Sequence, residues 1–173
     1  MHPSQQWDCL FSRFGVMFFD DPQAAFVNMA GFVRKGGRLA LCCWGPPPAN
    51  PWVGDLMAIV RQYVDLPPPD PEAPGPFAFA DRDRVTNILT TAGFSNPGFT
   101  AWEGPLYMGG AGSTALGATD FVLSATFVGD AIAEVSEAAR AEIEHRILER
   151  LAAHETDAGV VMQGHVWLIS ADR

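Results

Sequence analysis

The sequence predicts an α/β fold in a single domain that spans residues 1–173. Hydrophobic residues make up 48% of the chain and charged residues only 18%, a composition that can fill a buried core at this length. Two apolar, strand-like segments at 7–14 and 38–44 flank a helix-like segment, with short connections between them. Such a strand–helix–strand unit joins parallel strands of one sheet by a right-handed crossover.

Each element of this first unit has its own local signal. Residues 7–14 form a brief, partly aromatic apolar stretch, which favours a strand. Asp21 followed by Pro22 is typical of a helix N-cap and first turn, and predicts a helix over 22–34. Gly36-Gly37 predicts its left-handed C-cap. Residues 38–44 are almost continuously apolar, which is typical of a strand covered on both faces.

The rest of the chain continues with helices and strands around a proline-rich loop. Six prolines within residues 66–76 exclude regular structure there and indicate an extended loop or lid. We therefore expect a lid-like insertion at about 45–80. The remaining elements predicted from caps and periodicity are helices at 51–65 and 81–92, a strand at 94–108 interrupted at 96–98, helices at 114–128 and 135–154, and a strand at 160–170.

Charge and composition exclude several classes of partner. The formal net charge of −9 disfavours a protein that binds nucleic-acid backbones or anionic membranes. No apolar run approaches the length of a membrane span, and no signal peptide is visible, so we expect a cytoplasmic protein without a membrane partner. Cys9, Cys42 and Cys43 lie in apolar runs, where we expect them to be buried and inert. The spacing of the four histidines predicts no metal site.

The predicted strand ends suggest where a ligand could bind. In open α/β sheets, ligands bind at the carboxyl ends of parallel strands, which here are Ser12-Arg13-Phe14 and Trp44. Aromatic residues also surround the proline-rich loop, namely Trp44, Trp52, Phe77 and Phe79. The sequence is compatible with two roles for these residues, ordinary packing in the core and a position in the wall of a pocket.

A glycine-rich segment offers a second interpretation. Gly110-Ala111-Gly112-Ser113-Thr114-Ala115 matches G-x-G-x-x-A before a predicted helix, as in nicotinamide-dependent enzymes. However, two helical segments follow before the next strand, which departs from the strand–helix–strand context of that fingerprint. A flexible glycine loop is the competing interpretation.

Several segments resemble class I S-adenosylmethionine-dependent methyltransferases of the "type 11", ubiquinone/menaquinone-biosynthesis-like group. The resemblance covers essentially the whole chain, and its most specific string is Ser12-Arg13-Phe14-Gly15-Val16-Met17-Phe18-Phe19. The other segments that carry it are Trp7-Asp8, Asp21-Pro22, Arg34-Lys35-Gly36-Gly37-Arg38-Leu39, Trp44, Asn50-Pro51-Trp52, Gly75-Pro76-Phe77-Ala78-Phe79-Ala80-Asp81 and Ala92-Gly93-Phe94.

The resemblance implies a partial Rossmann-like sheet with strands equivalent to 4, 5, 6 and 7 of the family and flanking helices. Their order would be 4-5-7-6, with the last strand antiparallel. The chain would begin just before strand four and lack the acidic, glycine-rich cofactor loop and the acidic residue that binds the ribose. The S-adenosylmethionine site would therefore be incomplete in this chain.

The resemblance also assigns site residues. Ser12, Arg13 and Phe14 would border the methionine and sulfonium part of the cofactor. The substrate, a small molecule, would contact residues on the lid side, namely Trp44, Asn50, Trp52, Phe77 and Phe79. No residue is predicted to act as a catalytic acid or base, since methyl transfer in this family often depends on proximity and orientation.

A sheet that lacks its first strands would expose a long unpaired edge. That edge predicts self-association, and it leaves room for a non-catalytic remnant or interaction module of the same fold as the alternative function. The third possible function is that of a nicotinamide-dependent enzyme, and this interpretation depends on residues 110–115 alone.

Overall fold

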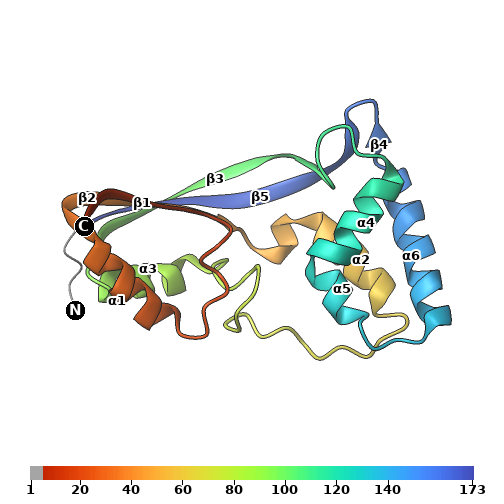
Figure 1. The fold of residues 1–173 in the computed structure, drawn as a ribbon, viewed down its shortest axis with the longest axis horizontal. Helices are drawn as coiled ribbons and strands as arrows, with labels where there is room; N and C mark the ends of the chain where they lie inside the picture. Colours follow the sequence, from red (N-terminus) through yellow and green to blue (C-terminus); the bar gives the residue numbers. More distant parts are fainter. Residues whose placement is uncertain (1–5) are drawn as a thin grey trace. The chain divides into compact units, whose positions relative to one another are not determined.

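The computed structural model describes residues 6–173 as a mixed α/β arrangement (Figure 1). Its elements are, in order, β1 (Trp7–Arg13), α1 (Pro22–Phe32), β2 (Val33–Trp44), a 3₁₀ turn η1 (Pro47–Ala49), α2 (Pro51–Val60), α3 (Arg82–Thr91), β3 (Ser95–Tyr107), α4 (Ala115–Ala125), α5 (Phe127–Ala131), α6 (Glu137–Ala152), β4 (Glu155–Thr156) and β5 (Gly159–Asp172).

The sheet has the strand order β1-β2-β5-β3, and β4 adds a short hairpin to β5. β1 and β2 are parallel, with Leu10 opposite Leu39, whereas β5 runs antiparallel to β2, with Ile169 opposite Leu41. Numbered as in the family, this order is 4-5-7-6 with an antiparallel last strand. The predicted α/β fold class and strand order are therefore confirmed.

The chain divides into two compact units. The first contains residues up to 47, together with 70–103 and 165–173, and the second contains 48–69 and 104–164. The long strands β3 and β5 contribute residues to both units.

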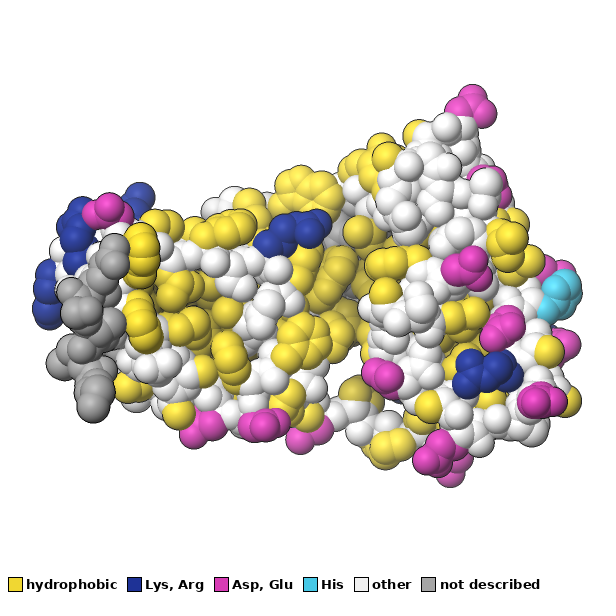
Figure 2. Space-filling model, in the orientation of Figure 1, with side chains coloured by type: hydrophobic (Ala, Val, Ile, Leu, Met, Phe, Trp, Pro, Cys, Tyr) yellow, Lys and Arg dark blue, Asp and Glu magenta, His cyan; other side chains and the backbone are white. Residues whose placement is uncertain are grey.

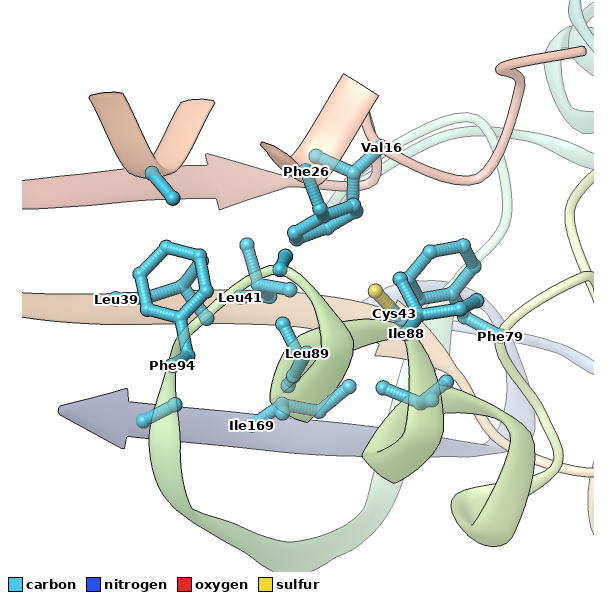
Figure 3. Close-up of a cluster of buried hydrophobic side chains, with 14 of the residues drawn as sticks. Val16, Phe26, Leu39, Leu41, Cys43, Phe79, Ile88, Leu89, Phe94 and Ile169 are labelled. Atoms are coloured by element: carbon cyan, nitrogen blue, oxygen red, sulfur yellow. The ribbon is translucent and has the colours of Figure 1, made fainter. Parts of the chain in front are cut away.

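The core of the first unit lies between the strands and the helices α1 and α3, which lie on the same side of β1 and β2 (Figure 1). Leu39, Leu41 and Cys43 point from β2 into this core and are almost fully buried. Figure 3 shows these side chains meeting residues from both helices, the loops and β5, namely Val16, Phe26, Phe79, Ile88, Leu89, Phe94 and Ile169.

The opposite side of β2 is less covered than its sequence predicts. Ala40, Cys42 and Trp44 alternate with the buried residues and are only half-buried. This face of the strand is therefore covered less completely than the face that meets the core. An apolar run shows that a strand avoids charges, but it does not show that a second layer of helices is present.

The first helix ends earlier than the glycine pair predicts. α1 begins as expected, because Asp21 caps it by accepting a hydrogen bond from the Ala24 N–H at 2.8 Å. It ends at Phe32, and Val33 is already extended. Gly36 is left-handed, with φ +76°, but it lies in the irregular start of β2, so the predicted C-cap is wrong.

Two other boundaries differ from the sequence-based expectations. The predicted interruption at 96–98 does not occur, because Asn96 adopts a left-handed φ of +52° while β3 continues through it. The helix expected at 114–128 breaks at Thr126, which is extended. Its side-chain oxygen accepts from the Val128 N–H at 3.2 Å and starts α5. A threonine that caps a new helix competes with continuation of the old one.

Helices α2, α4, α5 and α6 pack together in the second unit. Arg150 of α6 forms a 2.5 Å ion pair with Asp55 of α2. The side chains buried in this unit include Leu56, Val60, Val122, Val128, Ile132, Ile143, Ile147 and Leu151. Among the described residues, none of the helices is long and apolar enough to cross a membrane.

Candidate functional site

The carboxyl ends of β1 and β2 meet at one edge of the first unit. Arg13 lies opposite Cys42 in the parallel ladder, and the Phe14 N–H donates to the Cys42 carbonyl at 2.9 Å. This bond positions the Phe14 ring against the Trp44 ring, with centroids 4.7 Å apart and a 24° angle between planes. Two residues predicted for different roles therefore form one stacked aromatic pair.

Arg13 extends this stack. Its guanidinium carbon lies 5.0 Å from the centre of the Phe14 ring, within the range of a cation–π contact. Ser12 lies close to Gly15 in the turn that follows β1. A Cβ added at Gly15 would be only 3.1 Å from the Ser12 hydroxyl oxygen. The structure thus brings Ser12, Arg13, Phe14 and Trp44 together. Their assignment to a cofactor or substrate remains a prediction.

Phe14 adopts a backbone conformation that is uncommon for its residue type. Its φ is +57°, in the left-handed region. A bulky residue in this region is strained, at a cost of about 1–2 kcal/mol. The strain accompanies the sharp turn at the end of β1, which directs the ring toward Trp44. Residues held in this way tend to cluster at functional sites.

The predicted substrate-side residues fall in both units. Trp44 and Phe77 belong to the first unit, and Phe77 is half-buried in the turn before α3. Phe79 is only 1% exposed and stacks on Phe26 in the core, with ring centroids 5.7 Å apart.

Asn50 and Trp52 belong to the second unit, where both are buried. The indole N–H of Trp52 donates to Asn50 Oδ1 at 3.4 Å, and its ring lies 5.9 Å from that of Phe127. Their role in substrate binding stays a prediction, as does that of Phe77 and Phe79.

Sequence reasoning missed the contribution of β5 to this edge. The Gly45 N–H donates to the His165 carbonyl at 3.1 Å, and a Cβ on Gly45 would collide with the His165 ring. His165 also contacts the Trp167 ring edge-on at 4.7 Å, and its Nε2 lies 3.8 Å from Glu103 Oε1. The antiparallel register explains this contribution, because it places the middle of β5 beside the end of β2, with Val166 opposite Trp44.

Trp167 connects this edge with the end of the proline-rich loop. Its indole N–H donates to the Ala80 carbonyl at 3.0 Å. The guanidinium of Arg82, the first residue of α3, lies 5.4 Å from the Trp167 ring and 5.2 Å from the Phe99 ring. The loop end and the strand are therefore held by an aromatic and cationic cluster.

The cysteines are not activated at this edge. Burial, together with a smaller contribution from neighbouring Cys42, raises the pKa of the Cys43 thiol to about 12. Burial also raises the pKa of Cys42, although the positive charge of Arg13 partly opposes this. A raised pKa leaves little thiolate, which is the reactive form. Cys9, in contrast, is exposed, so the expectation that all three cysteines are buried is wrong.

Metal-binding clusters are not seen where the structure can be described: residues 6–173 contain no group of three or more His, Cys, Asp or Glu side chains placed to hold an ion. Of the four histidines, His2 lies outside the described residues.

The glycine-rich segment 110–115 does not present a free helix N-terminus. The Ala115 N–H at the start of α4 donates to Glu155 Oε2 at 3.0 Å, and the Gly117 N–H donates to the Thr114 hydroxyl at 3.2 Å. A dinucleotide pyrophosphate needs such N–H groups and would be repelled by a carboxylate there. The geometry therefore favours the competing interpretation, a glycine loop that packs against the β4–β5 hairpin, where Gly112 N–H donates to the Ala158 carbonyl at 2.8 Å.

No protein-family model and no curated protein matches this sequence. Solved structures do match. The YcgJ protein of Bacillus subtilis is 14% identical with a TM-score of 0.52, over 99% of this chain and 65% of that protein. A Bacillus halodurans C-125 protein assigned as a methyltransferase is 12% identical with a TM-score of 0.47, over 97% and 64% of the two chains.

A third match is geranyl diphosphate C-methyltransferase from Streptomyces coelicolor A3(2), solved with Mg²⁺, geranyl diphosphate and S-adenosyl-L-homocysteine. It is 15% identical with a TM-score of 0.38, over 99% of this chain and 49% of that protein. This chain thus spans less than two thirds of the length of these proteins. At these identities the likeness concerns the fold alone. The chain shares the mixed α/β fold of the YcgJ protein over its β1-β2-β5-β3 sheet.

Proposed function

We propose that this chain takes part in S-adenosylmethionine-dependent methyl transfer to a small-molecule acceptor. The observation that carries the proposal is the Arg13–Phe14–Trp44 stack at the carboxyl ends of two parallel strands. Ligands of open α/β sheets bind at this edge, and several segments of the sequence resemble methyltransferases that use this cofactor.

The residues at this edge fit one end of the cofactor. Arg13 is exposed and can form charge-assisted hydrogen bonds with the carboxylate of the methionine part. The aromatic faces of Phe14 and Trp44 favour a nearby positive charge such as a sulfonium. When bound, S-adenosylmethionine supplies an electrophilic methyl group on that sulfur. The residues of this chain would orient it toward the acceptor, and proximity would provide the rate enhancement.

The same edge lacks a group for the ribose. Neither of the strand ends, 12–14 and 43–45, carries a carboxylate, and a carboxylate is the side chain that binds ribose hydroxyls in comparable folds. We infer that the adenosine end of the cofactor is held by residues outside this chain. The net charge of −9 supports a small acceptor rather than a nucleic acid.

Isothermal titration with S-adenosylmethionine tests the proposal. We expect a dissociation constant of about 100 μM or tighter, equivalent to roughly −5.5 kcal/mol. Arg13→Met should weaken binding about tenfold through loss of the carboxylate contact. Arg38→Met is the matched control, because Arg38 also lies on the sheet surface but pairs with Asp172 at 3.2 Å.

A specific observation favours a second function. Within residues 6–173, β1 has a hydrogen-bonded neighbour on one side only, which suits an interaction module that lacks catalysis. Absence of binding at millimolar cofactor by the folded chain would support this function, and it would contradict the proposed one if binding did not return when the residues that hold the adenosine end are supplied. Equal binding by wild type and Arg13→Met would contradict the assigned role of Arg13.

A further inference from the structure

Arg82, the first residue of α3, has its guanidinium group held against two aromatic rings. The guanidinium carbon lies 5.2 Å from the centre of the Phe99 ring on β3 and 5.4 Å from the centre of the Trp167 ring on β5. The two rings meet edge to face, with centroids 6.1 Å apart and an 84° angle between planes. Arg82 is exposed to solvent all the same. A cation–π contact engages the charge of a guanidinium and leaves its N–H groups available for hydrogen bonds.

The N–H groups of this guanidinium have no acceptor within residues 6–173. Arg82 forms neither a hydrogen bond nor an ion pair with a described residue. Most other arginines in that part of the chain use their N–H groups: Arg84 donates to two carbonyls, and Arg150 pairs with Asp55. A guanidinium carries several donors in a fixed, planar fork. In Arg82 this fork is positioned by rings but is not used by the protein.

α3 offers Arg82 no carboxylate of its own. The residues that pair with a charged side chain on a helix lie three and four positions away, and for Arg82 these are Val85 and Thr86. Arg146 of α6, by contrast, lies 3.4 Å from Glu142, four residues before it. An ion pair along the helix therefore does not explain the position of Arg82.

The groups that hold the guanidinium are themselves fixed. The indole N–H of Trp167 donates to the Ala80 carbonyl at 3.0 Å, and the His165 ring meets the Trp167 ring edge-on at 4.7 Å. The start of α3 is fixed by Asp81, whose carboxylate accepts from the Arg84 N–H at 2.9 Å. A ligand that binds to a positioned side chain avoids the entropic cost of ordering it.

The carboxylates of the neighbouring elements leave the guanidinium unpaired among residues 6–173. Asp81 caps α3, and Glu103 of β3 lies 3.8 Å from His165 Nε2. The backbone N–H groups of Arg82 and Asp83, in the first turn of α3, also have no acceptor in the described chain. Such N–H groups carry partial positive charge, which adds to that of the guanidinium.

The overall charge of the chain does not attract anions. The formal net charge is −9, and Figure 2 shows acidic side chains spread over the visible face, whereas Lys and Arg gather in a few places. A long-range positive field therefore cannot supply the affinity for an anion. Any affinity has to come from the local arrangement of donors, so we expect dissociation constants in the millimolar range.

We propose that Arg82 binds an oxyanion, the carboxylate or phosphate group of a small molecule. A guanidinium forms paired, charge-assisted hydrogen bonds with either group. The site lies near the carboxyl end of β2, because Trp167 pairs with Cys43, the residue before Trp44. It is built from α3, β3 and β5, and β2 lies between β5 and β1 in the sheet.

The oxyanion site has a consequence for the proposed methyl transfer. β5 and β2 are neighbours about 4.8 Å apart, a distance that a small acceptor can span. The group bound by Arg82 would then be the anionic end of the acceptor, so the acceptor would be an acid. This consequence rests on the proposed function, whereas the oxyanion site itself does not.

NMR titration of the full chain in the absence of S-adenosylmethionine tests the site. Sodium acetate and inorganic phosphate, each added at constant ionic strength, should shift the backbone amide signals of Arg82 and Asp83 and the indole signal of Trp167 to saturation. Acetamide, the neutral counterpart of acetate, should not. Saturation by either anion supports the site, and the anion that binds more tightly identifies the carboxylate or the phosphate as its ligand. No saturable shift with either anion would overturn the proposal.

Two variants of Arg82 and one control assign the binding to the guanidinium. Arg82→Met fills similar space against the rings but has no donors, and it should raise the dissociation constant about tenfold or more. Arg82→Lys keeps the charge and the cation–π contact without the fork, so it should have an intermediate effect. Arg61→Met is the matched control, because Arg61 is also exposed and its side chain has no hydrogen bond or ion pair in the described chain.

The variants also define what would contradict the proposal. Equal weakening by Arg61→Met would show a general effect of charge, and unchanged binding by Arg82→Met would place the anion on the helix N-terminus alone. Either result would overturn the role of Arg82. The amide spectra of the same samples show whether each variant is folded.

A double titration separates this inference from the proposed function. Anion binding without cofactor binding would leave the oxyanion site standing alone, whereas cofactor binding without anion binding would contradict this inference only. If both bind, saturating anion should change the affinity for S-adenosylmethionine by less than about twofold, because the two ligands occupy different places. Mutual exclusion would show that the anion takes the place of the cofactor, and it would overturn the assignment to the acceptor.

Discussion

The ring of Phe14 stacks on the ring of Trp44, 4.7 Å between centroids, although thirty residues separate them in the chain. The contact exists because β1 and β2 are parallel neighbours and end at the same edge. It also requires Phe14 to adopt a left-handed backbone, with φ +57°. One prediction separates the energetic contribution of this backbone from that of the ring.

Replacing Phe14 by alanine and by glycine should give different stabilities. Both variants lose the aromatic contact, but glycine adopts positive φ without a steric penalty. We expect Phe14→Gly to be more stable than Phe14→Ala by about 1 kcal/mol, measured by urea unfolding. Equal stabilities, or a more stable alanine variant, would contradict the strain assigned to this position.

Two neighbouring residues of α1 should respond differently to truncation. Phe26 is fully buried and contacts Phe79, whereas Val27 is 53% exposed. Phe26→Ala should lower the free energy of unfolding by about 3–5 kcal/mol through lost burial and a residual cavity. Val27→Ala should change it by less than about 0.5 kcal/mol when measured at concentrations where the chain is monomeric. Similar losses for both would mean that the helix face is assigned incorrectly.

Arg84 should hold the loop that precedes α3. Its guanidinium donates to the carbonyl of Glu72 at 3.0 Å and also to that of Ala78. Arg84→Met should increase proteolysis within 70–80, because the loop loses its two side-chain anchors, and the cleavage rate measures the effect. Arg82→Met is the control, since Arg82 contacts the rings of Phe99 and Trp167 instead. Faster cleavage in the Arg82 variant alone would contradict the role of Arg84.

Cys43 should make stability sensitive to alkaline pH. Burial raises the pKa of its thiol to about 12 in the folded chain. The stability that this group contributes is therefore complete below its ordinary pKa and decreases as the pH rises toward 12. Urea unfolding of wild type and Cys43→Ala at increasing pH should show a shallower alkaline decline in the variant. Parallel declines would show that Cys43 is ionised without cost when folded.

The same burial predicts the order of cysteine alkylation. At pH 8 only about one Cys43 thiol in ten thousand would be a thiolate, and its side chain is inaccessible. Exposed Cys9 should react with iodoacetamide first, as identified by peptide mass spectrometry. Modification of Cys43 ahead of Cys9 in the folded chain would contradict the described packing.

The sequence by itself determined the succession of elements, because the signals for them are local. Asp21 with Pro22 starts a helix wherever it occurs, and the prolines of 66–76 exclude regular structure through their own geometry. The strand order followed from the resemblance of such short segments to a known fold. The predicted ends of helices and strands were wrong where a long-range contact determines them. Gly36 could have capped α1, but the chain becomes extended at Val33 to pair with β1.

Tertiary structure alone decided which side chains meet. The antiparallel register of β5 places His165 against Gly45 and lets Trp167 reach Ala80, and neither contact has a local signal. It also decided that Phe79 packs in the core and that Glu155 caps α4. Hydrophobic patterning reports how much surface a segment must bury, whereas the partner that buries it depends on chain pairing over long sequence separations.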